Sequence, residues 1–242
     1  MNFEDILDNK LDITWDTPNG VRADLIDCET VSMSKESGCI YLMFGIESGN
    51  QQVVNEIVKK DIDLTKVENA AKMCFEMELD TAAFYMIGFP GETKENIQET
   101  YNLAFEHLRR YKTRPHLFIA KPMKGTELYD VAEKSNLLVD IDPMKDDHLK
   151  YMTRQKMIET DDFNLEYLIS VFKKYRKNLF KNTMINWFKI SQTVPKIFLI
   201  SFLKLIVRIA RNPLRVRPIL FRYYIGKIIF PFSMSREKMP IE

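Results

Sequence analysis

The chain of 242 residues contains little cysteine and little histidine, and this excludes several kinds of site. Its three cysteines, Cys28, Cys39 and Cys74, are separated by long gaps and show no CxxC-type spacing. A sparse, odd set of this kind offers neither a disulfide framework nor a ready metal or cluster site, and it suits a reducing cytoplasm. The three histidines also lack the spacing of metal ligands. We therefore expect no metal ligands in this chain.

The sequence shows neither a secretion signal nor a transmembrane segment. Residues 1–5 are acidic and lack the apolar region of a signal peptide. Residues 196–211 are strongly apolar, but the stretch is too short and carries too many basic residues to cross a membrane. Together with the cysteine usage, these features predict a cytoplasmic protein.

The 35 basic and 34 acidic residues are distributed very unevenly. Residues 173–242 hold 16 basic and two acidic residues, whereas residues 1–172 hold 19 basic and 32 acidic ones. Strand patterns also stop well before the basic region. Such an asymmetry indicates two regions with different roles, and we place the boundary near 140–150. We predict an α/β domain over 1–145, followed by a basic, helical extension over 146–242.

The basic extension allows three interpretations. Within 196–211, Lys204, Arg208 and Arg211 follow helical spacing and form one stripe beside wide apolar sectors. Such a helix would lie at the surface of an anionic membrane as a peripheral contact. Alternatively, the extension docks against the acidic part of the same chain. Nucleic acid is the third candidate partner, but no recognised nucleic-acid-binding motif supports it.

Short apolar runs that stop abruptly at glycine and small polar residues recur along the first part of the chain. Two such junctions, residues 42–50 and 84–93, are each followed by a helical pattern. The apolar runs 39–46, 81–87 and 116–121 are typical of buried strands. Alternating strands and helices predict a parallel sheet, and ligands bind such sheets at the carboxyl ends of the strands. We therefore expect the site at these loops.

Four motifs of this region occur in a defined order: NGVRAD at 19–24, FGIESG at 44–49, GFPGET at 88–93 and GTELY at 125–129. Their order and spacing resemble the core of the radical S-adenosylmethionine (SAM) superfamily over about residues 3–138, and the nearest subgroup is the one often joined to a cobalamin-binding domain. The resemblance implies an α/β fold: an incomplete parallel (β/α) half-barrel, or partial TIM barrel, followed by the α-helical C-terminal extension.

The resemblance also implies a chemistry and its cofactors. Radical SAM enzymes bind a 4Fe-4S cluster through a CxxxCxxC loop, and the cluster reduces SAM to generate a radical that abstracts a substrate hydrogen. This sequence contains no such loop, and its cysteines cannot replace it. We interpret the chain as the C-terminal part of a radical SAM enzyme, whose cluster is bound by a missing N-terminal segment or by a partner chain. We expect a small-molecule substrate, methyl transfer or ring modification as the reaction, and cobalamin only as a cofactor of the parent protein.

Two other functions remain open from the sequence. In one, the chain is a degenerate, non-catalytic remnant that acts as a membrane-associated or partner-binding module. In the other, it is a generic half-barrel that binds another nucleotide or phosphate-bearing ligand through the same loops. The sequence identifies neither the catalytic residues nor the substrate, because one fold supports many reactions.

The resemblance assigns several residues to the SAM pocket. Glu47 and Ser48, at the end of a predicted strand, match a position that faces SAM in relatives; alternatively, Glu47 caps the following helix. Lys59 matches a base that pairs with the SAM carboxylate in relatives, and the adjacent Lys60 leaves the choice between the two lysines open. A solvated lysine at a helix end is the simpler interpretation of either residue.

Four further positions complete the predicted pocket. Ile87 and Gly88 resemble the edge that contacts adenine, since glycine lets the backbone approach a flat ring. A tight turn without a ligand explains the glycines almost as well. Arg22 and Gly125 match positions around the pocket for SAM or substrate, and for Arg22 an ion pair with a neighbouring aspartate is the alternative.

Overall fold

The computed structural model describes residues 3–140 and 156–193. In chain order the elements are α1 (Phe3–Asp8), β1 (Trp15–Asp16), the 3-10 helix η1 (Ala23–Leu25), α2 (Cys28–Glu36), β2 (Cys39–Glu47), the π-helix η2 (Val53–Ile57), α3 (Leu64–Glu76), β3 (Thr81–Ile87), α4 (Lys94–Tyr111), β4 (Arg114–Ile119), α5 (Glu127–Lys134), β5 (Leu138–Asp140), β6 (Lys156–Ile158) and α6 (Leu165–Thr193). The chain divides into two compact units, Met1–Tyr175 and Arg176–Glu242, and the first holds the sheet. The domain boundary that we expected near 140–150 falls mostly outside the described residues.

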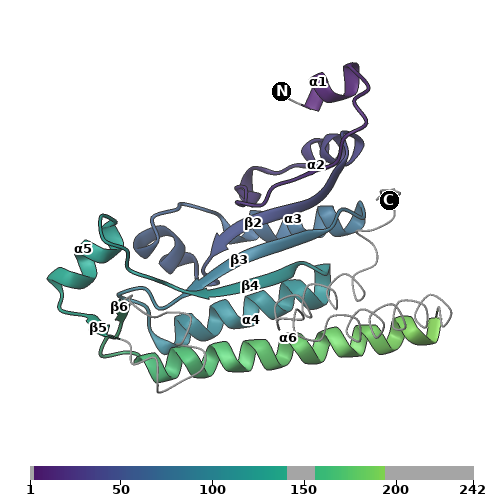
Figure 1. Cartoon of the computed structure of the whole chain (residues 1–242). Coiled ribbons are helices and arrows are strands. Elements are labelled where there is room, and N and C mark those ends of the chain that lie inside the picture. Colours follow the sequence, from purple (N-terminus) through teal and green to yellow (C-terminus); the bar gives the residue numbers. More distant parts are fainter. Residues whose placement is uncertain (1–2, 141–155, 194–242) are drawn as a thin grey trace, which may run out of the picture. The chain divides into compact units, whose positions relative to one another are not determined.

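Strands β1 to β4 lie side by side in sequence order, and every neighbouring pair is parallel (Figure 1). Gly45 of β2 lies beside Phe84 of β3, which in turn lies beside His116 of β4. Helical segments lie between consecutive strands of this sheet and return the chain to the start of the next strand, as parallel pairing requires. The sheet therefore forms a curled, incomplete β/α barrel, which confirms the predicted fold class.

Helices α3 and α4 pack against one face of this sheet (Figure 1). Alternation along β3 presents Ala83, Tyr85 and Ile87 to this face, and all three are fully buried. The Tyr85 hydroxyl lies 2.8 Å from Nδ1 of His107 in α4. Burial lowers the pKa of His107 to about 4, so its ring stays neutral near pH 7. The neutral pair joins α4 to the sheet without burying a charge.

The loop after β2 packs closely against α4. The Ser48 and Thr100 hydroxyls lie 3.0 Å apart, and the Gly49 amide donates to the Thr100 hydroxyl at 2.9 Å. A Cβ atom on Gly49 would lie 2.7 Å from both the Glu99 carbonyl oxygen and Thr100 Cα. Glycine is therefore required sterically at this position, and the contact holds the carboxyl end of β2 against α4.

Beyond β4 the structure differs from the prediction in one respect. We expected a helical extension, and the structure adds the short strand β6 to it, which pairs antiparallel with β5 and places Ile158 opposite Leu138. A strand of three residues is too short to show alternation in the sequence. Among the described helices, none combines the length and the apolar character needed to cross a membrane. The stretch 196–211 lies outside the described residues, so its three interpretations stay predictions.

Replacing Gly49 by alanine should destabilise the protein, because the added methyl group collides with backbone atoms of α4. We expect a loss of about 1–3 kcal/mol in the free energy of unfolding, measured by urea denaturation. Asn102→Ala, on the exposed face of the same helix, is the control and should change this free energy by less than about 0.5 kcal/mol. Equal effects of the two substitutions would contradict the steric argument.

Candidate functional site

The carboxyl ends of β2, β3 and β4 lie at one edge of the sheet, because these strands are parallel neighbours. At this edge β2 ends at Glu47 and β3 ends at Ile87. The loop after β4 leads through Gly125 to α5, and an ion pair of Lys59 with Glu127 links the first turn of α5 to the segment after η2. The loops that carry the predicted site residues therefore gather around the same edge.

Lys60 reaches back over the end of β2. Its ammonium donates to the Gly45 carbonyl oxygen at 2.9 Å and to Glu47 Oε1 at 2.7 Å. The side chains of Lys60 and Glu47 are 28% and 18% exposed, so the pair is partly shielded from water. A Cβ atom on Gly45 would lie only 2.6 Å from Lys60 Nζ. The missing side chain of Gly45 is therefore what allows the ammonium to lie on the strand.

The backbone around this pair adopts costly conformations. Glu47, Lys59 and Asp61 have φ angles of +72°, +57° and +49°. This left-handed region costs a residue other than glycine about 1–2 kcal/mol. Between Glu47 and Lys59, residues Val53–Ile57 form the π-helix η2, a wide turn that is frequent at functional sites. Backbone strain of this kind also gathers at binding sites, where surrounding contacts compensate for it.

Two of the predicted side chains are engaged elsewhere. The Ser48 hydroxyl is fully buried against Thr100, where it supports the packing beneath the site. The Lys59 ammonium pairs with Glu127 on the exposed surface. The sequence did not distinguish Lys59 from Lys60 as the lysine of the site, and in the structure Lys60 is the one that pairs with Glu47.

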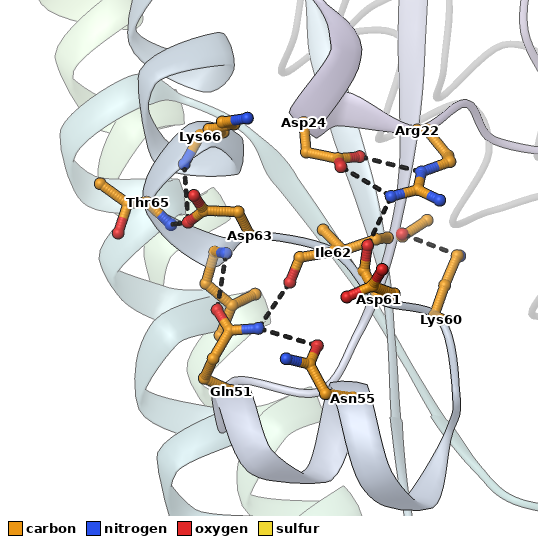
Figure 2. Close-up of polar contacts among 12 residues, drawn as sticks. Arg22, Asp24, Gln51, Asn55, Lys60, Asp61, Ile62, Asp63, Thr65 and Lys66 are labelled. Atoms are coloured by element: carbon orange, nitrogen blue, oxygen red, sulfur yellow. Dashed lines mark hydrogen bonds and ion pairs between the residues drawn. The ribbon is translucent and has the colours of Figure 1, made fainter.

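Arg22 is engaged within the protein as well (Figure 2). Its Nε and Nη2 atoms donate to the two Asp24 carboxylate oxygens at 3.1 and 2.7 Å, and Nη2 also donates to the Asp61 carbonyl oxygen at 2.5 Å. The hydrogen bond from Arg22 holds the pKa of Asp24 below its ordinary value. Arg22 thus forms the ion pair that the sequence offered as an alternative, and contact with a ligand stays a prediction.

The loop Gly88–Gly91 is organised from within by Glu92. Oε2 of this carboxyl group accepts from the amides of Gly88 and Phe89 at 2.7 and 2.8 Å. Glu92 is fully buried, and its Oε1 atom has no hydrogen-bond partner within the described part of the chain. Burial raises the pKa of Glu92 to about 7. Gly88 and Gly91 have φ angles of +93° and +90°, which glycine adopts without strain.

The open face of the sheet, opposite the helices, carries a group of apolar and aromatic side chains. Phe84 lies 5.9 and 5.8 Å, between ring centroids, from His116 and Phe118 of β4. Phe118 is 46% exposed, and Met86 lies on the same face of β3 by alternation. Burial lowers the pKa of His116 to about 4, so this ring is neutral near pH 7.

The sequence analysis did not assign this open-face group to the site. The predicted adenine contact, Ile87, is fully buried on the helix-covered face, so any ligand would meet its backbone. The signal that could have found the group is the i, i+2 spacing of Phe84 with Met86 and of His116 with Phe118.

The cysteines do not fit a 4Fe-4S cluster. Burial raises the pKa of Cys39 to about 11 and of Cys74 to about 12, whereas the ligands of a cluster are thiolates. Cys28 is exposed, and its sulfur lies 3.2 Å from the Met73 sulfur. Within 3–140 and 156–193, no group of three or more His, Cys, Asp or Glu residues could hold a metal ion.

The motifs and the barrel can be compared with known proteins. Residues 4–104 match the radical SAM superfamily. The match covers less than half of the chain, and it assigns a radical SAM domain to that part. Similarity to this superfamily implies SAM and a 4Fe-4S cluster as cofactors.

Several curated relatives are enzymes. The chain is 31% identical to cytidylyl-2-hydroxyethylphosphonate methyltransferase of Streptomyces wedmorensis over 48% of the chain and 22% of that protein. It is 25% identical to the anaerobic magnesium-protoporphyrin IX monomethyl ester cyclase of Cereibacter sphaeroides over 33% of the chain and 13% of that protein. Bacteriochlorophyllide d C-12(1)-methyltransferase of Chlorobaculum tepidum is 21% identical over 65% of the chain and 32% of that protein. The chain thus spans at most about a third of the length of these relatives.

Glu92 should make the stability of the protein depend on pH. Its pKa is raised from 4.5 to about 7 in the folded chain, so between these values the folded state binds more protons than the unfolded state. The free energy of unfolding contributed by Glu92 therefore falls as the pH rises from 4.5 to 7, by about 3 kcal/mol in total.

Urea denaturation at a series of pH values measures this effect, with Glu92→Gln as the matched variant that stays neutral. The lowered pKa of His107 and His116 gives the opposite slope in both proteins, so the difference between the two curves isolates Glu92. Parallel curves between pH 4.5 and 7 would contradict the assignment.

Proposed function

We propose that this chain forms part of the SAM and substrate pocket of a radical SAM enzyme. The observation that carries the proposal is the pair of Lys60 and Glu47, which lies on Gly45 at the carboxyl end of β2. Ligands of β/α barrels bind at this edge of the sheet. SAM ends in a methionine group with a carboxylate and an ammonium, and a lysine beside a glutamate is complementary to both charges.

The pair retains the hydrogen-bonding capacity for such a group. A lysine ammonium has three N–H donors, and Lys60 uses two of them on Gly45 and Glu47. The third can donate to the carboxylate of the ligand. Lys60 contacts Oε1 of Glu47, and the second carboxylate oxygen can accept from the ammonium or a ribose hydroxyl. Charge-assisted hydrogen bonds of this kind contribute about 1.5–3 kcal/mol each.

Two other features support the remaining parts of the pocket. The loop Gly88–Gly91 has a defined shape, imposed by Glu92, and offers its backbone to the flat adenine ring. The open face with Phe84, His116 and Phe118 offers an aromatic floor for the substrate.

We further propose that the 4Fe-4S cluster is bound by residues outside this sequence, on a preceding segment or on a partner chain. The burial of Cys39 and Cys74 and the absence of a CxxxCxxC loop support this division. The methyltransferases and the cyclase among the relatives favour methyl transfer or ring modification as the reaction. Cobalamin would then act in the parent protein.

Two nucleosides test the site for the amino acid group: S-adenosylhomocysteine, which carries this group, and methylthioadenosine, which lacks it. We expect the protein to bind S-adenosylhomocysteine at least about tenfold more tightly, as one charge-assisted hydrogen bond predicts. Isothermal titration calorimetry measures both dissociation constants.

Lys60→Met should abolish this preference, and Gly45→Ala should reduce it because the added methyl group displaces the ammonium. Lys72→Met is the matched control, since Lys72 is an exposed lysine on α3 paired with Glu76. Equal affinity for the two nucleosides, or no binding of either at millimolar concentration, would contradict the proposal.

A further inference from the structure

Lys60 lies in a loop whose shape is imposed by side chains from other parts of the fold (Figure 2). This loop joins η2 to α3, and both neighbours of Lys60, Lys59 and Asp61, have left-handed backbone conformations. The Lys60 amide donates to the Val54 carbonyl oxygen at 3.0 Å, which ties the loop to η2. A residue other than glycine keeps a left-handed conformation only where surrounding contacts compensate for its cost.

Gln51 provides the first of these contacts. Its Nε2 atom donates to the Ile62 carbonyl oxygen at 2.6 Å, and its Oε1 atom accepts from the Leu64 amide at 2.9 Å. Nε2 also donates to Asn55 Oδ1 at 3.0 Å, which orients the amide (Figure 2). One side chain therefore connects the helical segment before the loop to the first residue of α3.

Arg22 provides the second contact. Its guanidinium is held by both oxygens of Asp24 and donates to the carbonyl oxygen of Asp61, directly after Lys60. The segment that carries Arg22 is attached to β2, because the Gly45 amide donates to the Val21 carbonyl oxygen at 3.1 Å. Arg22 therefore links the loop to the same strand on which the Lys60 ammonium lies.

We propose that Arg22 and Gln51 are positioning residues that hold the Lys60 ammonium over Gly45 and Glu47, and so set the orientation of the amino acid group of the cofactor. The inference rests on the proposed function of the pair formed by Lys60 and Glu47. It gives Arg22 a role through the Asp61 carbonyl group, in place of direct contact with a ligand.

Chemical acetylation of lysines, followed by mass spectrometry, tests the positioning without any ligand. Gln51→Met keeps the length of the side chain and removes its hydrogen bonds. We expect acetylation of Lys60 to become about three- to tenfold faster, which corresponds to the loss of one hydrogen bond. Gln52→Met is the matched control and should leave the rate unchanged, because the Gln52 amide donates to Glu56 on the same helical segment.

Arg22→Lys is the second variant. It keeps the positive charge, but an ammonium lacks the planar fork that bonds Asp24 and Asp61 together. We expect faster acetylation of Lys60 here as well, with the rate at the exposed Lys72 as an internal reference.

The nucleosides show whether the effect passes through Lys60. Gln51→Met should lower the preference for S-adenosylhomocysteine over methylthioadenosine about three- to tenfold, because the acetylation and binding effects share the same lost bond. In the Lys60→Met background, Gln51→Met should not change the relative affinity for the two nucleosides any further. Affinity for methylthioadenosine should stay unchanged throughout.

The outcomes separate the two proposals. Unchanged acetylation of Lys60 in both Gln51→Met and Arg22→Lys would overturn the positioning role, whatever the nucleosides show. An equal loss of affinity for both nucleosides in Gln51→Met would overturn it too. So would an undiminished effect of Gln51→Met on nucleoside affinity in the Lys60→Met background. Faster acetylation in a protein that shows no nucleoside preference would support the positioning of Lys60 and overturn the proposed function alone.

Discussion

The close approach of the Lys60 ammonium to the backbone of β2 is the constraint on which the proposed pocket depends. Gly45 accepts the hydrogen bond, and no Cβ atom stands in the way of the ammonium. Glycine weakens a strand because it has no side chain to pack, so its presence in a strand with neighbours on both sides is best explained by the space it leaves. With Glu47 two residues further on, this space places opposite charges at the rim of the sheet, while the aromatic rings of β3 and β4 line its open face.

The barrel could be predicted because its strands are continuous apolar runs that end at clear stop signals. The structure places β2 at Cys39–Glu47 and β3 at Thr81–Ile87, close to the runs that define them in the sequence. A buried strand in a parallel sheet needs apolar residues on both faces, and the helices between strands leave a different period. Strand β6 could not be found in this way, because three residues are too few to show a period.

The side chains of the site were less predictable, and the reasons are local. The π-helix η2 and the left-handed conformation of Lys59 change the direction of successive side chains. An ideal α-helical period therefore does not predict whether Lys59 or Lys60 points toward Glu47. No glycine marks the left-handed residues in the sequence. On β3, both faces are apolar, so the pattern does not distinguish the open face with Met86 from the covered face with Ile87.

The two loops of the proposed pocket are held in different ways, and this explains why only one of them is a readable motif. The loop Gly88–Gly91 is ordered by Glu92, the next residue in the chain, so all its determinants lie within one short stretch. The loop around Lys60 depends on Gln51 and on Arg22, and Arg22 lies 39 positions from the carbonyl group that it holds. Such a loop has no compact signature, because its determinants are side chains brought together by the fold. The arginine of the motif at 19–24 is then explained by the loop that it supports, and its spacing from the lysine reflects the topology of the barrel more than the shape of any ligand.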